Sequence, residues 1–341
     1  MREHYFDLPV GGLTSARSVL LDSNISSRVE HLHRRQQAGR RIDPLAPEMI
    51  KLRNLADAIP ADAVLITGLS ALEAQLRRMP RETDNERYNS RADAAAFYLS
   101  SGRDYLRTLL AGDIGRGLTI ESAPGTAALA PLDPLRRWMA VSYSALLKAV
   151  EIHLAHTGSA EEKVDAFRFF LERDLKASPS REGWVGFLLL GGLPESKQRA
   201  RRLLKIDSRG NLFDNVWGAT WDLWYTRMPT MVQQSIFQAR VKTPLTFVTD
   251  DDALIQVVAG LRDSFPIRTA LGTEFGADQP DFDMFVPGVR PLLAAYMARD
   301  GNRVITRSRG IARATMRGAQ YEARQLERAI EALMRDDPSR S

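Results

Sequence analysis

The chain has 341 residues, of which 44% are hydrophobic and 26% charged, which is the composition of a globular protein able to bury a core. Its length predicts two domains, or one domain with a large insertion. It contains no cysteine, which excludes disulfides, thiolate metal sites and a cysteine nucleophile. The formal net charge of +5 favours an anionic partner only mildly.

The first residues contain no apolar run typical of a secretory signal. The longest apolar stretch, residues 184–193, is too short to span a bilayer. We therefore expect a cytoplasmic protein without a membrane partner.

Three short apolar runs predict strands of a parallel sheet, at residues 19–22, 63–67 and 245–248. Unbroken apolar runs of this length indicate strands buried on both faces. Acidic residues directly end or follow the first and third runs, and Glu73 lies in the helix predicted after the second. Because parallel strands end at one edge of a sheet, these acids are expected to meet there.

Each of these acids also has a purely structural explanation. Asp22 and Asn24 would shape a turn and cap the next helix, and Glu73 stands at capping-box spacing from Ser70. One acid of the run at residues 250–252 would cap the helix that follows. Three adjacent like charges repel one another, however, and a bound cation is the usual reason to tolerate them. The residues alone leave both explanations open.

The middle of the chain has a different pattern. From about residue 80 to residue 209, apolar residues recur at helical spacing between Gly, Pro, Asp and Ser, which predicts a helical insertion. His153 and His156 within it are expected to be a surface pair without a metal. The predicted division is an α/β domain at 1–79 and 210–310, the insertion at 80–209, and a C-terminal helix at 311–341, with a last strand at 302–306.

A helix is predicted to begin at Asp214, with a carboxylate at its start. Trp217, Trp221 and Trp224 recur on one face of this helix and are expected to pack in the core. Asp222 lies about 80° around the helix from Asp214. It is expected to support the site from two turns further along, with an ion pair to Arg227 as the alternative.

A strongly basic segment lies just before this helix. Its cations are expected to contact the phosphates of a nucleic acid without reading bases, although a solvated helix face is the alternative. The segment contains Lys197, Arg199, Arg201, Arg202 and Lys205.

Four carboxylates, from Asp22, Glu73, Asp214 and Asp251, are thus predicted to converge. Carboxylates without His or Cys suit hard divalent cations such as Mg²⁺ or Mn²⁺. Two such ions about 3.5–4 Å apart can activate a water and stabilise a leaving oxygen in phosphodiester hydrolysis.

These residues resemble the motifs of PIN-domain nucleases, in the same order. Residues 19–25 (VLLDSNI) resemble the opening strand and acid, residues 70–73 (SALE) the second acid, residues 214–220 (DNVWGAT) the third, and residues 248–251 (VTDD) the closing Thr-x-Asp. The resemblance covers residues 15–79 and 210–265. It implies a Rossmann-like three-layer α/β/α fold with a parallel central sheet and a Mg²⁺- or Mn²⁺-dependent endonuclease, most often acting on RNA.

The resemblance also implies the roles of individual residues. The four acids are the expected catalytic and metal-binding residues, and the residues expected to support them are Asn24, Thr249, Asp250, Asp252 and Asp222. A nuclease acting on DNA or on a structured junction, and a catalytically inactive scaffold that binds nucleic acid or protein, are the alternatives. The helical regions also leave room for a homo-oligomer or a protein partner.

Overall fold

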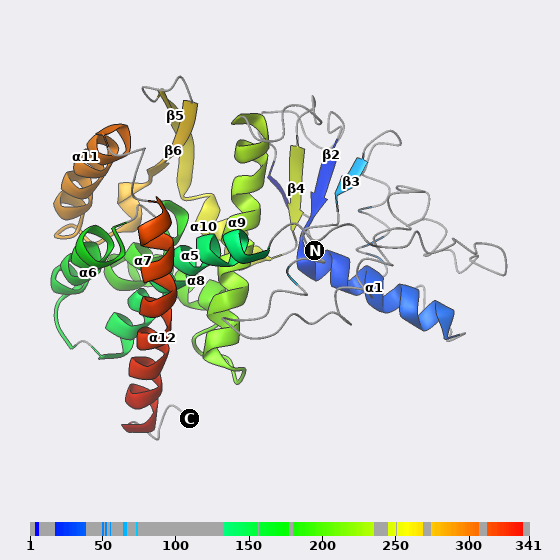
Figure 1. Ribbon diagram of the computed structural model, residues 1–341, viewed down its shortest axis with the longest axis horizontal. Helices are drawn as coiled ribbons and strands as arrows, with labels where there is room; N and C mark the ends of the chain where they lie inside the picture. Colours follow the sequence, from blue (N-terminus) through cyan, green and yellow to red (C-terminus); the bar gives the residue numbers. More distant parts are fainter. Residues whose placement is uncertain are drawn as a thin grey trace. The chain divides into compact units, whose positions relative to one another are not determined.

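The computed structural model describes the helices and strands drawn as coloured ribbons in Figure 1, together with short segments beside them and a few isolated positions. The described residues are 4–6, 18–38, 50, 52, 55, 64–66, 73, 132–155, 157–176, 180–234, 245–249, 251–268, 274–306 and 312–336. The chain divides into two compact units: unit 1 contains Met1–Ala130 and Trp224–Asp251, and unit 2 contains Pro131–Leu223 and Asp252–Ser341.

Unit 1 contains a small four-stranded sheet with the order β1-β4-β2-β3. Strand β2 is parallel to both β3 and β4, whereas β1 pairs antiparallel with β4. The strands are β1 (His4–Phe6), β2 (Ser18–Leu21), β3 (Val64–Ile66) and β4 (Leu245–Thr249). Three strands therefore form where the apolar runs predicted them, and β1 was not anticipated.

The helix α1 (Ser23–Gln37) begins directly after β2. Its buried residues Ile25, Val29 and Leu32 are spaced four and three apart, so they share one face of the helix. The exposed Arg34 forms an ion pair with the buried Glu30 at 3.0 Å. The short interval between β2 and α1 places Asp22 at the junction of strand and helix.

The predicted Rossmann-like three-layer α/β/α fold is wrong. The described residues are mainly helical, and the strands of the sheet in unit 1 have only three to five residues. A three-layer fold requires helices that cover both faces of an extended parallel sheet. The helices from residue 132 onwards instead pack largely against one another, so their apolar faces form a helical core.

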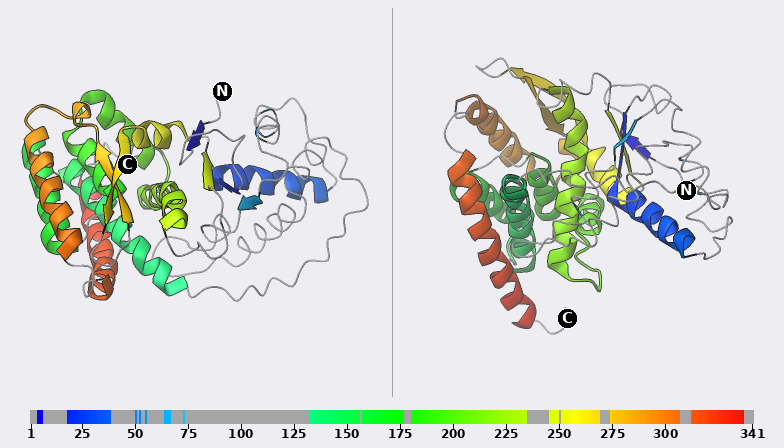
Figure 2. Two further views of the ribbon diagram at one scale, coloured as in Figure 1. Left: turned by 90° about the horizontal axis from the view of Figure 1, so that it is seen from above. Right: turned by 45° about the vertical axis from the view of Figure 1, so that its right-hand side comes forward.

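Unit 2 is this helical assembly. Helix α12 packs extensively along α5, and α7 packs against α5, α6 and α8 (Figure 2). Its elements are α5 (Leu132–Ala155), α6 (Ala160–Phe169), the π-helix η2 (Phe170–Leu175), α7 (Ser180–Gly191), α8 (Pro194–Leu204), α10 (Asp252–Val258), the hairpin β5 (Leu261–Arg268) and β6 (Glu274–Pro280), the short helix η3 (Phe282–Met284), α11 (Arg290–Thr306) and α12 (Ala312–Asp336).

Helix α9 (Leu212–Gln234) contributes residues to both units. Trp217, Trp221 and Trp224 are all buried, which confirms their predicted place in the core. The C-terminal helix predicted at residues 311–341 corresponds to α12, which spans Ala312–Asp336. The strand predicted at residues 302–306 is wrong, because those residues form the last turns of α11.

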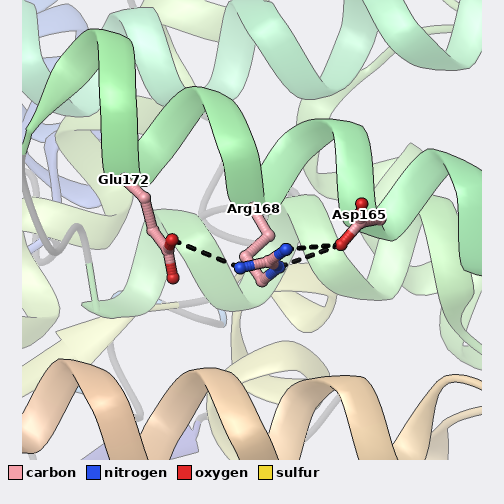
Figure 3. A network of polar contacts seen from close by, with 3 residues as sticks. All are labelled: Asp165, Arg168 and Glu172. Atoms are coloured by element: carbon pink, nitrogen blue, oxygen red, sulfur yellow. Dashed lines mark hydrogen bonds and ion pairs between the residues drawn. The ribbon is translucent and has the colours of Figure 1, made fainter.

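Helix α6 shows how local chemistry fixes the ends of these helices. The Ser159 hydroxyl accepts a hydrogen bond from the Glu162 backbone N–H at 3.2 Å, and the Ser159 N–H donates to the Glu162 carboxylate at 2.8 Å. Further along, Arg168 donates to Asp165 and to Glu172 (Figure 3). The bond to Glu172 joins α6 to the π-helix that continues it.

Candidate carboxylate site

Asp22 is the best-defined candidate residue in unit 1. It follows the last residue of β2 and is fully buried, and its backbone N–H continues the ladder by donating to the Val248 carbonyl at 3.0 Å. Its carboxylate accepts the Thr249 hydroxyl at 2.6 Å. Asn24 supplies two longer bonds, from its backbone N–H at 3.5 Å and its side-chain amide at 3.4 Å.

Thr249 connects the ends of two parallel strands. The register places Leu21 of β2 opposite Val248 of β4, so the next residues, Asp22 and Thr249, come side by side at the carboxyl edge. Thr249 is also fully buried, and its hydroxyl accepts the Asp251 backbone N–H at 3.1 Å. One hydroxyl therefore joins the segments of two predicted acids.

The structural explanation of Asp22 is also visible in this geometry. The Asp22 carbonyl accepts the Ser26 N–H at 2.9 Å, and the carboxylate faces the Asn24 N–H, which is the arrangement of an N-cap on α1. At 3.5 Å this capping bond is long, and the bond from Thr249 is much shorter. A cap alone does not require a buried hydroxyl from the neighbouring strand.

The remaining predicted acids have different environments. Glu73 belongs to unit 1 and its Oε2 atom is shielded from solvent. Asp214 is exposed in the first turn of α9, in the part assigned to unit 2. Asp222 is buried in α9, and Asp252 is exposed at the first residue of α10, where a negative charge is favoured. Asp250 lies outside the described residues.

These positions bear on the predicted divalent cation. Among the described residues, no group of three or more His, Asp or Glu side chains is placed to hold a metal ion. Magnesium in proteins is commonly held by one or two carboxylates, with waters and substrate phosphates completing its shell. Asp22 and Asp251 are oxygen donors of that kind, and their segments meet at the Thr249 hydroxyl.

The predicted basic segment belongs to unit 2 and lies on α8 and its C-terminal end. Two of its arginines have carboxylate partners: Arg201 donates through Nε to Asp207 at 3.1 Å, and Arg199 lies 4.0 Å from Glu195. Lys205 follows α8 in the left-handed conformation, with φ of 50°. The exposed members of the segment are Arg202 and Lys205. Contact of this segment with nucleic acid stays a prediction.

A cationic cluster around His153 was missed at the sequence level. His153 is half-buried at the end of α5, and its pKa is lowered to about 4 by burial first, and then by the positive charges of Arg201, Lys163 and Lys197, against the opposing charge of Asp207. Lys163 lies on α6, so no spacing in the sequence connects it to α8. His153 is therefore not the exposed member of a surface pair that its spacing predicted.

Unit 2 also contains a pocket of about 740 Å³ between α5, α6, the π-helix and α11. Carboxylates dominate its polar lining, and its one lysine, Lys148, is paired with Glu151 at 2.6 Å. A negatively charged pocket repels a phosphate. A nucleic acid would therefore bind elsewhere on this unit. The acidic residues of the lining are Glu151, Glu161, Glu162, Asp165 and Asp174.

No protein-family model, curated protein or solved structure matches this chain. Within the described residues, no helix combines the length and the apolar character needed to cross a membrane. The functional proposal accordingly depends on the residues of the chain itself.

Proposed function

We propose that unit 1 carries a divalent-cation-dependent phosphodiesterase site centred on Asp22, with the endonuclease activity of the PIN-domain proteins that its motifs resemble. One observation carries this proposal: a fully buried carboxylate at the edge of two parallel strands, held at 2.6 Å by the hydroxyl of Thr249. The carboxyl edge of parallel strands is where α/β proteins commonly place their ligands.

The described donors to Asp22 fit the role of a carboxylate ligand. Thr249 and Asn24 both donate hydrogen bonds to its carboxyl oxygens and so hold it in a defined orientation. Asp22 and Asp251 would hold Mg²⁺ or Mn²⁺, and Thr249 would fix the orientation of Asp22. When bound, the cation would polarise a phosphate and lower the pKa of a water.

RNA is the favoured substrate because the family that the motifs resemble acts most often on RNA. The basic side chains of α8 and its C-terminal end are the part of unit 2 that we propose binds the phosphates of this polyanion. Both statements are part of the proposal. The cleavage assay described next compares RNA with DNA as substrates.

The test is cleavage of end-labelled single-stranded RNA and DNA by the purified protein with Mn²⁺, with Mg²⁺ or with EDTA. We expect RNA cleavage that needs the metal and is lost in Asp22→Asn. Asp281→Asn is the matched control, because Asp281 also accepts the N–H two residues on, at 3.1 Å, and caps a short helix far along the sequence. Equal cleavage by Asp22→Asn and wild type would refute the site.

The alternative is an inactive scaffold in which Asp22 only caps α1. The observation in its favour is the N-cap geometry described above. Under this alternative no substrate is cut with any metal, and Asp22→Asn and Asp281→Asn both act on stability alone.

A further inference from the structure

Helix α12 has one buried and one exposed face. Its buried side chains recur every three or four residues from Ala319 to Ile330, and the helix packs along α5. Tyr321, Arg324 and Arg328 are all exposed, and at three- and four-residue spacing they lie within about 60° of one another on the opposite side of the helix. These three residues are the exposed α12 face.

This face combines positive charge with an aromatic ring. Within the described residues, neither Arg324 nor Arg328 forms an ion pair with a carboxylate, whereas Arg335 further along the helix lies 4.0 Å from Glu331. Tyr321 is 62% exposed, which makes it the most exposed large hydrophobic side chain in the described part of the chain. Tyrosine and arginine are enriched in the parts of protein interfaces that contribute most to binding.

The acidic pocket between α5, α6, the π-helix and α11 has the complementary character. Phe169 lines it and is 54% exposed, second only to Tyr321 among the large hydrophobic side chains of the described residues. Among the carboxylates of the lining, Asp165 is bound by Arg168 (Figure 3). Glu161 and Asp174 form no ion pair within the described ranges. The pocket therefore offers free negative charge beside an exposed ring.

We infer that unit 2 binds a second copy of this chain, with the exposed α12 face of each copy in the acidic pocket of the other. The two arginines of α12 pair with Glu161 and Asp174 of the other copy, and Tyr321 packs beside Phe169. The contact thus joins opposite charges, which select the partner and the orientation, with the burial of two aromatic rings.

The contacts within unit 2 favour a closed dimer. Helix α12 packs against both α5 and the π-helix η2, and residues of both also line the acidic pocket. The exposed α12 face and the pocket therefore belong to neighbouring elements, and a two-fold axis lets each copy supply both surfaces at once. The same reciprocal contact forms twice in such a dimer.

Charge alone also fits a polyanion such as RNA on the exposed α12 face. A polyanion would leave the acidic pocket and the ring of Phe169 without a ligand, because the pocket repels phosphates. A second copy accounts for both surfaces. All of these residues belong to unit 2, so the inference stands or falls independently of the phosphodiesterase site proposed for unit 1.

The first experiment measures the dimer dissociation constant by sedimentation velocity over a range of protein concentrations at low salt. The α12 variant carries Arg324→Glu and Arg328→Glu, and the pocket variant carries Glu161→Arg and Asp174→Arg. Each variant places like charges opposite one another, so we expect each to raise the dissociation constant at least about tenfold. Added salt should weaken the wild-type dimer, because it screens exposed charges.

Mixing the α12 variant with the pocket variant is the decisive step. In a mixed dimer every α12 face meets a pocket of opposite charge, so the mixture should associate about as well as wild type. Restored association also shows that both variants are folded. Arg202→Glu with Arg209→Glu is the control, since it makes the same change of net charge at exposed positions of unit 2 outside α12. It should change the dissociation constant less than about twofold.

The aromatic part of the contact has its own variants. Tyr321→Ala and Phe169→Ala should each raise the dissociation constant at least about fivefold, as expected for aromatic residues at the centre of an interface. Met297→Ala is the matched control, because Met297 is also an exposed large hydrophobic side chain but belongs neither to the α12 face nor to the pocket lining. It should leave the dissociation constant nearly unchanged.

Several results would overturn the inference. Wild-type protein that stays monomeric at every concentration would do so, as would a dimer that the α12 and pocket variants do not weaken, or variants whose mixture stays monomeric. An average mass that keeps growing with concentration would contradict the closed two-fold form. Fluorescence anisotropy with single-stranded RNA is a separate arm. Loss of RNA binding in the α12 variant, together with a monomeric wild type, would assign this face to a polyanion instead.

Discussion

Replacing Thr249 with Val tests the hydrogen bond on which the candidate site depends. Valine has nearly the same shape as threonine, but it carries a methyl group in place of the hydroxyl. The variant therefore loses the donor at 2.6 Å from the buried Asp22 carboxylate, and the Asp251 N–H loses its acceptor at 3.1 Å.

The size of the effect follows from the charge of the acceptor. A hydrogen bond to an ionised group contributes about 1.5–3 kcal/mol, roughly twice the value of a neutral pair. The Asp251 N–H that loses this acceptor is only partly buried and adds less. We expect Thr249→Val to lower the free energy of unfolding by about 2–3 kcal/mol. Thr249→Ser keeps the hydroxyl, so it should retain most of the wild-type free energy of unfolding.

Thr220→Val is the matched control. Thr220 is also fully buried, but its hydroxyl donates at 2.8 Å to the neutral Val216 carbonyl within α9, so we expect a loss below about 1 kcal/mol. Urea unfolding followed by circular dichroism gives the overall effect. Hydrogen exchange of peptides covering residues 18–25 and 245–251 locates it. Equal losses in the two variants, or unchanged exchange in those peptides, would refute an ionised Asp22 held by Thr249.

Three further predictions concern unit 2. Because the pKa of His153 is lowered from 6.5 to about 4, the unfolded chain binds more protons between these values, and the free energy of unfolding should fall as the pH falls through that window. The loss should be about 1–2 kcal/mol after allowance for partial exposure, and urea unfolding at several pH values should show it vanish in His153→Gln. Ser159→Ala should lose about 1 kcal/mol of helix capping in thermal unfolding, whereas an equal loss in Ser159→Asn would contradict the cap. Tyr143→Phe removes a hydroxyl that donates to Glu327 of α12 at 2.7 Å; it should cost about 1–3 kcal/mol and speed hydrogen exchange in α12, and unchanged exchange there would show that the bond does not hold α12.

Strands β2, β3 and β4 could be predicted from the sequence because each coincides with a short apolar run. Val19, Leu20 and Leu21 are all fully buried, as an unbroken apolar run requires. The strand at His4–Phe6 escaped prediction, because three residues without a pattern become a strand only by pairing with β4 about 240 residues away. The paired strands β1 and β4 lie far apart in the sequence, and no local pattern near His4–Phe6 predicts that they pair.

The arrangement of layers could not be predicted because helical periodicity does not identify the partner of a helix. An apolar helix face can cover a sheet or another helix with the same residues. Residues 184–190 of α7 are all buried, and α7 contacts helices on several sides. Similarly, the β-branched residues Val304, Ile305 and Thr306 favour a strand, yet they continue α11, which shows tertiary context overriding local preference.

The charged residues that act on His153 show the same limit for side chains that come from several helices. Lys197 and Arg201 could be grouped from sequence because they are close along one helix, but Lys163 and His153 come from two other helices. All three helices pack against α7, and α5 and α6 also contact each other, which no local sequence pattern predicts.

The motif resemblance and the fold class therefore have to be judged separately. The motif around Asp22 specifies only a buried strand, an acid at its end and the start of a helix, which can form in a small sheet as well as in a three-layer domain. The described sheet reproduces this local arrangement, including the Thr249 hydroxyl on the neighbouring strand, without the layers that the resemblance implied. Metal-dependent chemistry depends on the carboxylates at the strand edge and not on the number of layers behind them. Cleavage by wild type and its loss in Asp22→Asn consequently test the nuclease proposal even though the predicted fold is wrong.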